Sequence, residues 1–209
     1  MLSLTDRLES TLRTEAGELP VNLAFNTVLD WYKVSENEDF SIMQKVKIGW
    51  QLFFNGQKLE FDSENDYEIA AKALGDLSDY INQDPYNDPD DYQAEQKSSP
   101  SNKLFSYTQD AEAIYASFIF DYNIDLLDEM DKMRWEKFRA LFNNLSPKSP
   151  FKRIIEIRQR STKGLEGEEL ASLQEAQNYY ALKGQSTSSV DEAIGSMFNM
   201  LMTQIKQGQ

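Results

Sequence analysis

The sequence predicts a mainly α protein, a helical bundle of about six to seven helices with a small β-hairpin near its N-terminus. Apolar residues recur at the three- and four-residue spacing of helices over most of the chain, and strand-like alternation is confined to the beginning. Hydrophobic residues make up 40%, and the 12 Phe, 10 Tyr and 3 Trp exceed what disordered chains carry. These observations together indicate a folded helical protein with an aromatic core.

The predicted hairpin comprises residues 11–14 and 18–23. Apolar and polar residues alternate on both sides of Ala16-Gly17, which is a plausible turn. Pro20 has no N–H group to donate, so we expect its strand to lie at an edge.

Three helices are expected in the N-terminal part, over residues 24–34, from Asp39 or Ser41 to about residue 54, and over 63–81. Ser63 is a good N-cap because a serine hydroxyl accepts a hydrogen bond from a free backbone N–H group of the first turn. Asn55-Gly56 is expected to end the second helix. The apolar faces are predicted to contain Val28, Trp31, Tyr32, Met43, Val46, Trp50, Phe53, Phe54, Tyr67, Ala70, Leu74, Leu77 and Ile81.

The C-terminal part is expected to contain helices over about 109–122, 126–145, 150–158 and 167–182, and a last one after Ser189. Thr108 is the predicted cap of the first, and Ser149-Pro150 places a proline at the first helical position of the third. Gly164 and Gly167 flank the start of the fourth. The expected face of the first is Ala111, Ile114, Phe118 and Tyr122, and that of the second is Leu127, Met130, Arg134, Trp135, Phe138, Leu141, Phe142 and Leu145.

Composition divides the chain into four parts. Residues 1–83 contain the hairpin and the first helices. Residues 84–103 are acidic and proline-rich and lack Val, Ile and Leu, which predicts a loop. Residues 104–183 are helical and are expected to share one core with 1–83. Residues 184–209 are predicted to be a polar linker and an amphipathic helix.

Charge and missing residue types exclude several function classes. The chain has 209 residues, with 21 Lys+Arg against 35 Asp+Glu, a net charge of −14, and neither Cys nor His. Ser-His-Asp and Cys-His catalysis and Cys/His zinc sites are therefore impossible. The negative charge opposes nucleic-acid binding. No apolar run is long enough to span a membrane, and the N-terminus lacks a signal-peptide core. We expect an intracellular protein that is not an enzyme, without cofactor, catalytic residue or metal ligand.

Three acidic stretches were compared with calcium-binding loops and with paired catalytic carboxylates. Residues 121–125 fit the opening of an EF-hand loop, but position six is Leu126 and position twelve is Lys132, so the glycine and the bidentate glutamate are missing. A second window, 84–95, has Pro89 where glycine is needed. Asp128, Glu129 and Asp131 are close in sequence, but acid–base catalysis needs carboxylates opposed across a cleft. Residues 121–125 are better interpreted as a junction between helices, 84–95 as a solvated acidic loop, and the cluster at 128–131 as a solvated face.

A basic stretch contrasts with the acidic chain. Six basic residues lie between Lys148 and Lys163, and Glu156 is the single acidic residue among them. The candidate basic patch comprises Lys152, Arg153, Arg158 and Arg160. It could bind an anionic partner surface, or it could pair with carboxylates of the same chain, which surface arginines usually do. Internal pairing is the favoured interpretation.

The C-terminal segment has the pattern of an amphipathic helix. The candidate partner-binding residues are Val190, Ile194, Met197, Phe198, Leu201 and Ile205, which repeat at helical spacing. Met197, together with Met200 and Met202 nearby, suits an adaptable binding surface. Docking on the protein's own core is an equally good interpretation. Membrane binding is disfavoured, because only Lys206 is basic there while Asp191 and Glu192 are acidic.

An ordered set of segments resembles a phage protein family. These are MLSLTDRLE and LPVNLAFNTVLDWY at the start, YASFIFDYNIDLL from Tyr115, MRWEKFRALFNNLS from Met133 and SPFKRIIEIR from Ser149. Together they resemble the family named after gene product fifteen of certain siphophages of Gram-positive bacteria, over roughly residues 1–183. That family often has Gly at the position of Asn123 and two adjacent aromatic residues where this chain has Trp135-Glu136. Asn tolerates the left-handed conformation that Gly would supply.

The resemblance implies a role in tail assembly, because genes of that family typically lie between those of the major tail protein and the tape measure protein. The expected function is a tail assembly chaperone that binds the tape measure protein, the tail tube protein or both, with self-association possible. It would act in the bacterial host cytoplasm and be absent from the mature virion. Two alternatives remain: an acidic DNA mimic or other host-directed inhibitor, and a structural tail component retained in the virion.

Overall fold

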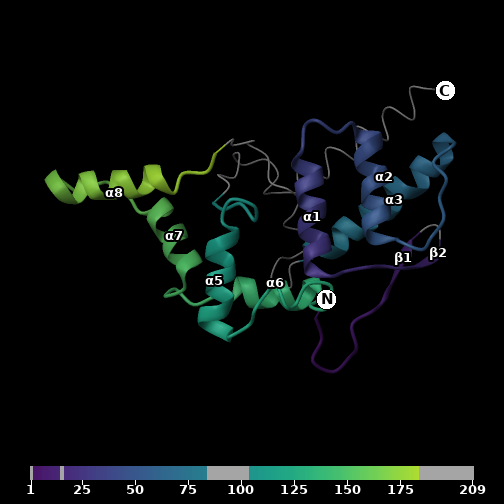
Figure 1. Ribbon diagram of the computed structural model, residues 1–209, viewed down its shortest axis with the longest axis horizontal. Coiled ribbons are helices and arrows are strands. Elements are labelled where there is room, and N and C mark those ends of the chain that lie inside the picture. Colours follow the sequence, from purple (N-terminus) through teal and green to yellow (C-terminus); the bar gives the residue numbers. More distant parts are fainter. Residues whose placement is uncertain (1, 15–16, 84–103, 184–209) are drawn as a thin grey trace, which may run out of the picture. The chain divides into compact units, whose positions relative to one another are not determined.

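A computed structural model describes residues 2–14, 17–83 and 104–183 (Figure 1). These residues form two compact units. Unit 1 contains residues 2–14, 17–83 and 131–137, and unit 2 contains residues 104–130 and 138–183. The described residues contain seven helices and one two-stranded antiparallel sheet, which confirms the predicted mainly α class with a small hairpin.

The hairpin of unit 1 pairs β1, Thr11–Thr14, with β2, Gly17–Pro20. Thr11 lies opposite Pro20, and Thr14 lies opposite Gly17. Gly17 adopts a positive φ of 110°, which a glycine accommodates without steric cost. The prediction of a small hairpin is confirmed, with the second strand at Gly17–Pro20 instead of 18–23.

Three helices follow in unit 1: α1, Phe25–Glu36; α2, Ile42–Phe53; and α3, Glu64–Asn82. Ser41 caps α2 and Ser63 caps α3, in each case by accepting a hydrogen bond from the third N–H group of the helix. The side chains of Gln44 and Asp66 complete the two capping boxes. Of the two starts proposed for the second helix, Ser41 is therefore the one adopted.

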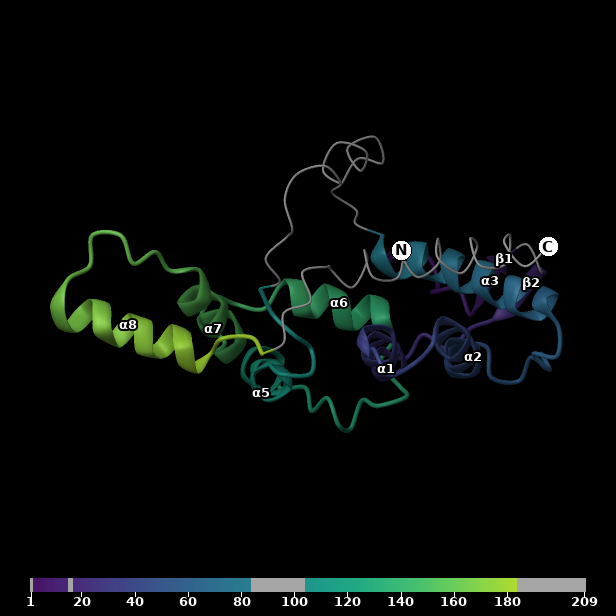
Figure 2. The same cartoon turned by 90° about the horizontal axis from the view of Figure 1, so that it is seen from above.

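The core of unit 1 forms where α1, α2 and α3 meet. Figure 2 views α1 and α2 nearly end-on, with α3 running across them. Trp31 of α1 is fully buried and meets Phe53 of α2 edge to face, with ring centroids 6.1 Å apart. A Cβ atom at Gly49 would lie 2.7 Å from Cζ3 of Trp31, so this close approach requires a glycine. The predicted apolar faces supply this core.

Residues 131–137 pack into unit 1 although they follow α5 in the sequence. The backbone N–H of Phe25 donates to the carbonyl of Met133 at 3.0 Å, and the N–H of Trp135 donates to Leu23 at 2.7 Å. The indole Nε1 of Trp135 donates to the carbonyl of Ile81 at 3.1 Å. This segment thereby joins the start of α1 to the end of α3.

The prediction of a continuous helix over 126–145 is wrong, because α6 spans only Trp135–Asn143. The carboxylate of Asp125 accepts a hydrogen bond from the N–H of Leu127 at 2.9 Å, which favours a turn over a helix. Asp131 adopts a positive φ of 60°, and its backbone N–H and side chain both bond to Asn26. The tertiary partners in α1 therefore override the helical spacing of Leu127 and Met130.

A buried polar cluster occupies the beginning of α6. Glu136 is 9% exposed, and its carboxylate accepts hydrogen bonds from Arg134 at 2.7 and 3.2 Å and from the hydroxyl of Tyr80 at 2.8 Å. Burial alone would raise the pKa of Glu136, but the hydrogen bonds, chiefly from Arg134, leave it below its usual value. Burial and the bond to Glu136 raise the pKa of Tyr80 to about 12.

This cluster predicts a stability change at alkaline pH. Because the folded-state pKa of Tyr80 is raised, its contribution is complete below about pH 10 and is lost as the pH rises through about 12. The free energy of unfolding of wild type minus that of Tyr80→Phe should therefore fall over this interval. Urea titrations across it measure the difference.

The control for this prediction is Tyr179→Phe, since Tyr179 is 80% exposed. Its difference from wild type should stay constant over the same pH interval. A Tyr80 difference that is equally flat would contradict the role assigned to the cluster.

Unit 2 contains α5, Ala111–Tyr122; the later residues of α6; α7, Pro150–Gln159; and α8, Gly167–Tyr179. Pro150 takes the first position of α7 as predicted, but the hydroxyl of Ser149 donates to the carbonyl of Ser146 at 2.7 Å instead of capping the helix. The prediction that Thr108 caps α5 is wrong. Ser106 instead accepts the N–H of Gln109, and the carboxylate of Asp110 accepts the N–H of Ser106 at 3.0 Å.

The core of unit 2 is built from aromatic rings. Phe138 is fully buried and stacks between Phe118, at 5.2 Å and 8°, and Phe142, at 5.8 Å and 12°. Phe142 also contacts Phe151 of α7, with centroids 5.1 Å apart. The rings of Phe105 and Tyr107 each lie 5.3 Å from that of Phe142. Stacked and tilted rings at these distances add to the free energy gained from burial.

The domain division predicted from composition remains a prediction in part. Residues 84–103 and 184–209 lie outside the described residues. A common core for 1–83 and 104–183 also stays a prediction. The new observation is that residues 131–137 group with unit 1.

Candidate functional site

The candidate basic patch divides into buried and exposed members. Arg158 is held inside unit 2, where its side chain is 9% exposed and that of its partner Asp110 is 4% exposed. Two hydrogen bonds of 2.7 and 2.8 Å join the guanidinium to the carboxylate. The same guanidinium donates to the carbonyls of Tyr180 at 2.7 Å and Leu104 at 3.0 Å. Arg158 therefore serves the fold, as the favoured interpretation of internal pairing predicts.

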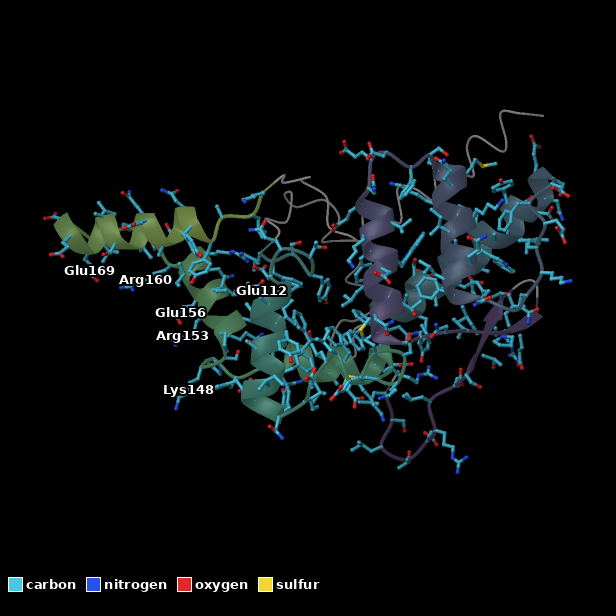
Figure 3. All side chains as sticks on the ribbon, viewed as in Figure 1. Glu112, Lys148, Arg153, Glu156, Arg160 and Glu169 are labelled. Atoms are coloured by element: carbon cyan, nitrogen blue, oxygen red, sulfur yellow. The ribbon has the colours of Figure 1, made fainter. Side chains whose placement is uncertain are left out.

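Arg160, Lys152 and Arg153 lie in different surroundings. Arg160 contacts Glu169 at 3.2 Å, and both side chains are more than half exposed, so this ion pair adds little stability. Arg153 is exposed and Lys152 is half-buried, and neither makes an ion pair among the described residues. Figure 3 labels Arg153 and Glu156 on the outer side of α7. The solvent-facing surface of α7 thus carries mixed charge.

A second surface was not predicted. The apolar segment, as we call it, comprises the exposed side chains of Ile119, Phe120, Leu127 and Met130, which are 39%, 60%, 67% and 47% exposed. Ile119 and Phe120 lie near the end of α5, and Leu127 and Met130 lie in the connection that follows. The face opposite them on α5 is buried through Ile114 and Phe118. The four residues fall within one short stretch of the sequence, and exposed large apolar residues that gather on a surface are typical of interaction sites.

The sequence contains a signal for this surface. Apolar residues occur all around the circumference of α5, AEAIYASFIFDY, and a helix at the surface of a unit can bury only one side of such a set. The predicted face of Ala111, Ile114, Phe118 and Tyr122 accounted for one side. Ile119 and Phe120 on the other side had no assigned partner.

Several contacts fix α5 within unit 2. The buried hydroxyl of Ser117 accepts the N–H of Phe151 at 2.9 Å, which satisfies one of the free N–H groups at the start of α7. The carboxylate of Asp121 accepts hydrogen bonds from the N–H and the hydroxyl of Ser146 at 2.7 and 2.6 Å. Tyr122 donates to the carbonyl of Leu141 at 2.9 Å. Ile119 and Phe120 are therefore presented on a firmly held helix.

The chain leaves α5 through a left-handed residue. Asn123 has a φ of 53°, as the comparison with glycine at this position predicted. The N–H of Ile124 bonds back to the carbonyl of Phe118, and the hydroxyl of Tyr115 donates to Asp125 at 3.1 Å. The hydrogen bond to Asp125 is the main cause that raises the pKa of Tyr115, and burial is the second. The carboxylates of Asp121 and Asp125 thus act as acceptors for groups of unit 2.

The structure does not describe the remaining predicted site residues. Val190, Ile194, Met197, Phe198, Leu201 and Ile205 fall outside the described residues. Within residues 2–14, 17–83 and 104–183, no three acidic side chains converge as a metal site requires. No helix in the described part of the chain has the length and apolar character needed to cross a membrane.

Both units are helical, and unit 2 has an aromatic core, mixed charge on the exposed side of α7 and exposed apolar side chains at and after the end of α5. Comparison with family models places the chain among phage proteins: the model described as Bacteriophage Gp15 protein matches residues 4–182. The chain belongs to this family, as the resemblance indicated. Searches of curated proteins and of solved structures found no match.

Proposed function

We propose that this protein is a phage tail assembly chaperone that binds the tape measure protein, the tail tube protein or both during tail morphogenesis. The observation that supports the proposal is the apolar segment of a phage-family protein, with Ile119 and Phe120 on a firmly held helix and Leu127 and Met130 in the connection after it. A tape measure is long and helical and must stay in solution until tube subunits polymerise around it. Exposed apolar side chains can cover the apolar stripe of such a client helix.

The charge of the chain suits this task. With a net charge of −14, the chain would keep a bound apolar client in solution. Many copies along one client would add avidity without tight individual contacts. Such a role needs no catalytic group, cofactor or metal ion.

Mixed surface charge supports the chaperone over a DNA mimic. A mimic needs carboxylates in rows at phosphate-like spacing. Along α7 and below α8 as drawn in Figure 3, Arg153 and Arg160 alternate instead with Glu156 and Glu169. Exposed Phe120 also has no counterpart in a phosphate backbone. We place the protein in the bacterial host cytoplasm during assembly and expect it to leave before the virion matures.

The proposal is tested by co-expression with the tape measure protein of the same phage. We expect the soluble fraction of the tape measure protein to increase, and a complex of the two to purify through a tag on either chain. The tail tube protein is tested in the same way. A tape measure protein that is equally soluble alone, with no complex recovered for either partner, would refute the proposal.

A further inference from the structure

We propose that β1 of a second copy of this chain pairs with β1, so that two hairpins join across a two-fold axis into one antiparallel sheet. The inference goes beyond the proposed function and does not depend on it. It follows from the hydrogen-bonding pattern of the hairpin, which leaves the outer edge of β1 better able to accept a strand than that of β2.

The pairing pattern of the hairpin shows which backbone groups point outward. The N–H of Val21 donates to the carbonyl of Ser10 at 3.0 Å, so these two residues form a hydrogen-bonded pair. Hydrogen-bonded and non-hydrogen-bonded pairs alternate along an antiparallel ladder. The pairs whose backbone groups point away from the partner strand are therefore Thr11 with Pro20 and Arg13 with Glu18.

The outer edges of the two strands differ in the donors that they offer. On β2, Pro20 has no N–H group, and beyond the strand the N–H of Asn22 already donates to the carbonyl of Phe53 at 2.8 Å. On β1, Thr11 and Arg13 are exposed, and neither makes a backbone-to-backbone hydrogen bond outside the hairpin within the described part of the chain. An open strand edge of this kind accepts a further strand through its main chain.

A two-fold axis at Leu12 satisfies the outward groups of both copies at once. Thr11 of one copy then lies opposite Arg13 of the other, and each such pair exchanges both N–H to carbonyl hydrogen bonds. The two contacts are identical, as a closed two-fold interface requires. Leu12, which is half-buried, meets its own equivalent on the face where Thr14 is buried.

The local charge permits this pairing in an otherwise acidic chain. Residues 2–14 contain two acidic and two basic residues, whereas the whole chain has a net charge of −14. Arg13 faces Thr11 of the copy and keeps its ion pair with Glu18, 3.4 Å away on the same hairpin. Glu9 precedes β1 and Glu15 follows it in the sequence, so like charge confines the pairing to the strand itself.

Other occupants suit the edge less well. A client helix has its own backbone groups paired internally, so it cannot add to a strand. An extended segment of a client could add to it, but a second copy already offers a strand that matches β1 in register, in its apolar residue and in charge.

Leu12→Cys tests the register, because the chain contains no cysteine of its own. In the two-fold register the introduced side chains face each other in a non-hydrogen-bonded pair with Cα atoms about 4.5 Å apart, within the reach of a disulfide. We expect mild oxidation to convert the full chain into a disulfide-linked dimer, which non-reducing electrophoresis detects.

The matched control for the crosslink is Leu19→Cys. Leu19 lies opposite Leu12 in the hairpin and is also half-buried, but in the joined sheet it belongs to an outer strand, far from its equivalent. This variant should stay uncrosslinked. Equal crosslinking of Leu12→Cys and Leu19→Cys, or none in either, would overturn the inference.

Arg13→Pro tests the hydrogen bonds between the copies. It removes an outward N–H group from a position that does not bond within the hairpin, as Pro20 does on β2. Sedimentation equilibrium of the wild-type chain should show a dimer at high micromolar concentration, and Arg13→Pro should weaken it at least about tenfold. Circular dichroism verifies that the variant is folded.

Arg13→Ala is the control for the side chain. It removes the ion pair with Glu18 but keeps the N–H group, so it should dimerise as wild type does. A monomeric wild-type chain, or an Arg13→Ala dimer as weak as that of Arg13→Pro, would overturn the inference. So would a wild-type monomer whose capture of a co-expressed tail protein is lost in Arg13→Pro, because the edge would then take a client strand.

Discussion

Replacing Arg158 by alanine is expected to destabilise unit 2 by about 3–5 kcal/mol, the cost of breaking a buried ion pair from one side. The variant leaves the carboxylate of Asp110 buried without its guanidinium partner. It also removes the donors to the carbonyls of Tyr180 and Leu104, so the segment before α5 and the end of α8 lose their common link to α7. Urea unfolding followed by far-ultraviolet circular dichroism measures the loss.

Arg153→Ala is the matched control, because Arg153 lies on the same helix and is exposed. Its effect should stay within about 0.5 kcal/mol. Tryptophan fluorescence reports the unfolding of unit 1 as a second signal, because Trp31, Trp50 and Trp135 all belong to that unit. An Arg158→Ala variant as stable as Arg153→Ala would contradict the role of the buried pair.

Replacing Phe138 by alanine is expected to cost about 3–5 kcal/mol, as for other buried aromatic residues. Phe138 is fully buried between the rings of Phe118 and Phe142, so the truncation opens a cavity among stacked rings that cannot close without moving α5. The midpoint of urea unfolding should fall accordingly, and Phe138→Leu should recover part of the loss.

The control for the cavity is Phe120→Ala on the exposed side of α5. Because that ring is 60% exposed, its removal should change stability by less than about 1 kcal/mol. Equal losses at Phe138 and Phe120 would show that α5 is buried on both sides, contrary to the structure.

Elements set by local sequence were predictable. Ser41 and Ser63 act on N–H groups three residues away, and Pro150 suits the first turn of α7 by its own geometry. The apolar faces of α1, α2 and α3 followed from spacing alone, because each helix turns one continuous stripe toward the core.

Elements set by distant partners were not predictable. The connection before α6 is held by Asn26 and Phe25, more than 100 residues away in the sequence, so the local pattern of Leu127 and Met130 was misleading. The partner of Arg158 lies 48 residues away in the sequence, and only the fold identifies it as Asp110. The exposure of Ile119 and Phe120 could not be predicted, because it depends on which side of α5 the aromatic core covers.

The most direct test of the central claim is quantitative mass spectrometry of two samples from phage-infected cells. One sample contains assembling complexes captured through a tag on this chain, and the other contains purified mature particles. A chaperone should be captured together with the tape measure protein, in many copies per client, and should be missing from the particles. A fixed number of copies retained in mature particles, or capture without the tape measure protein, would contradict the account.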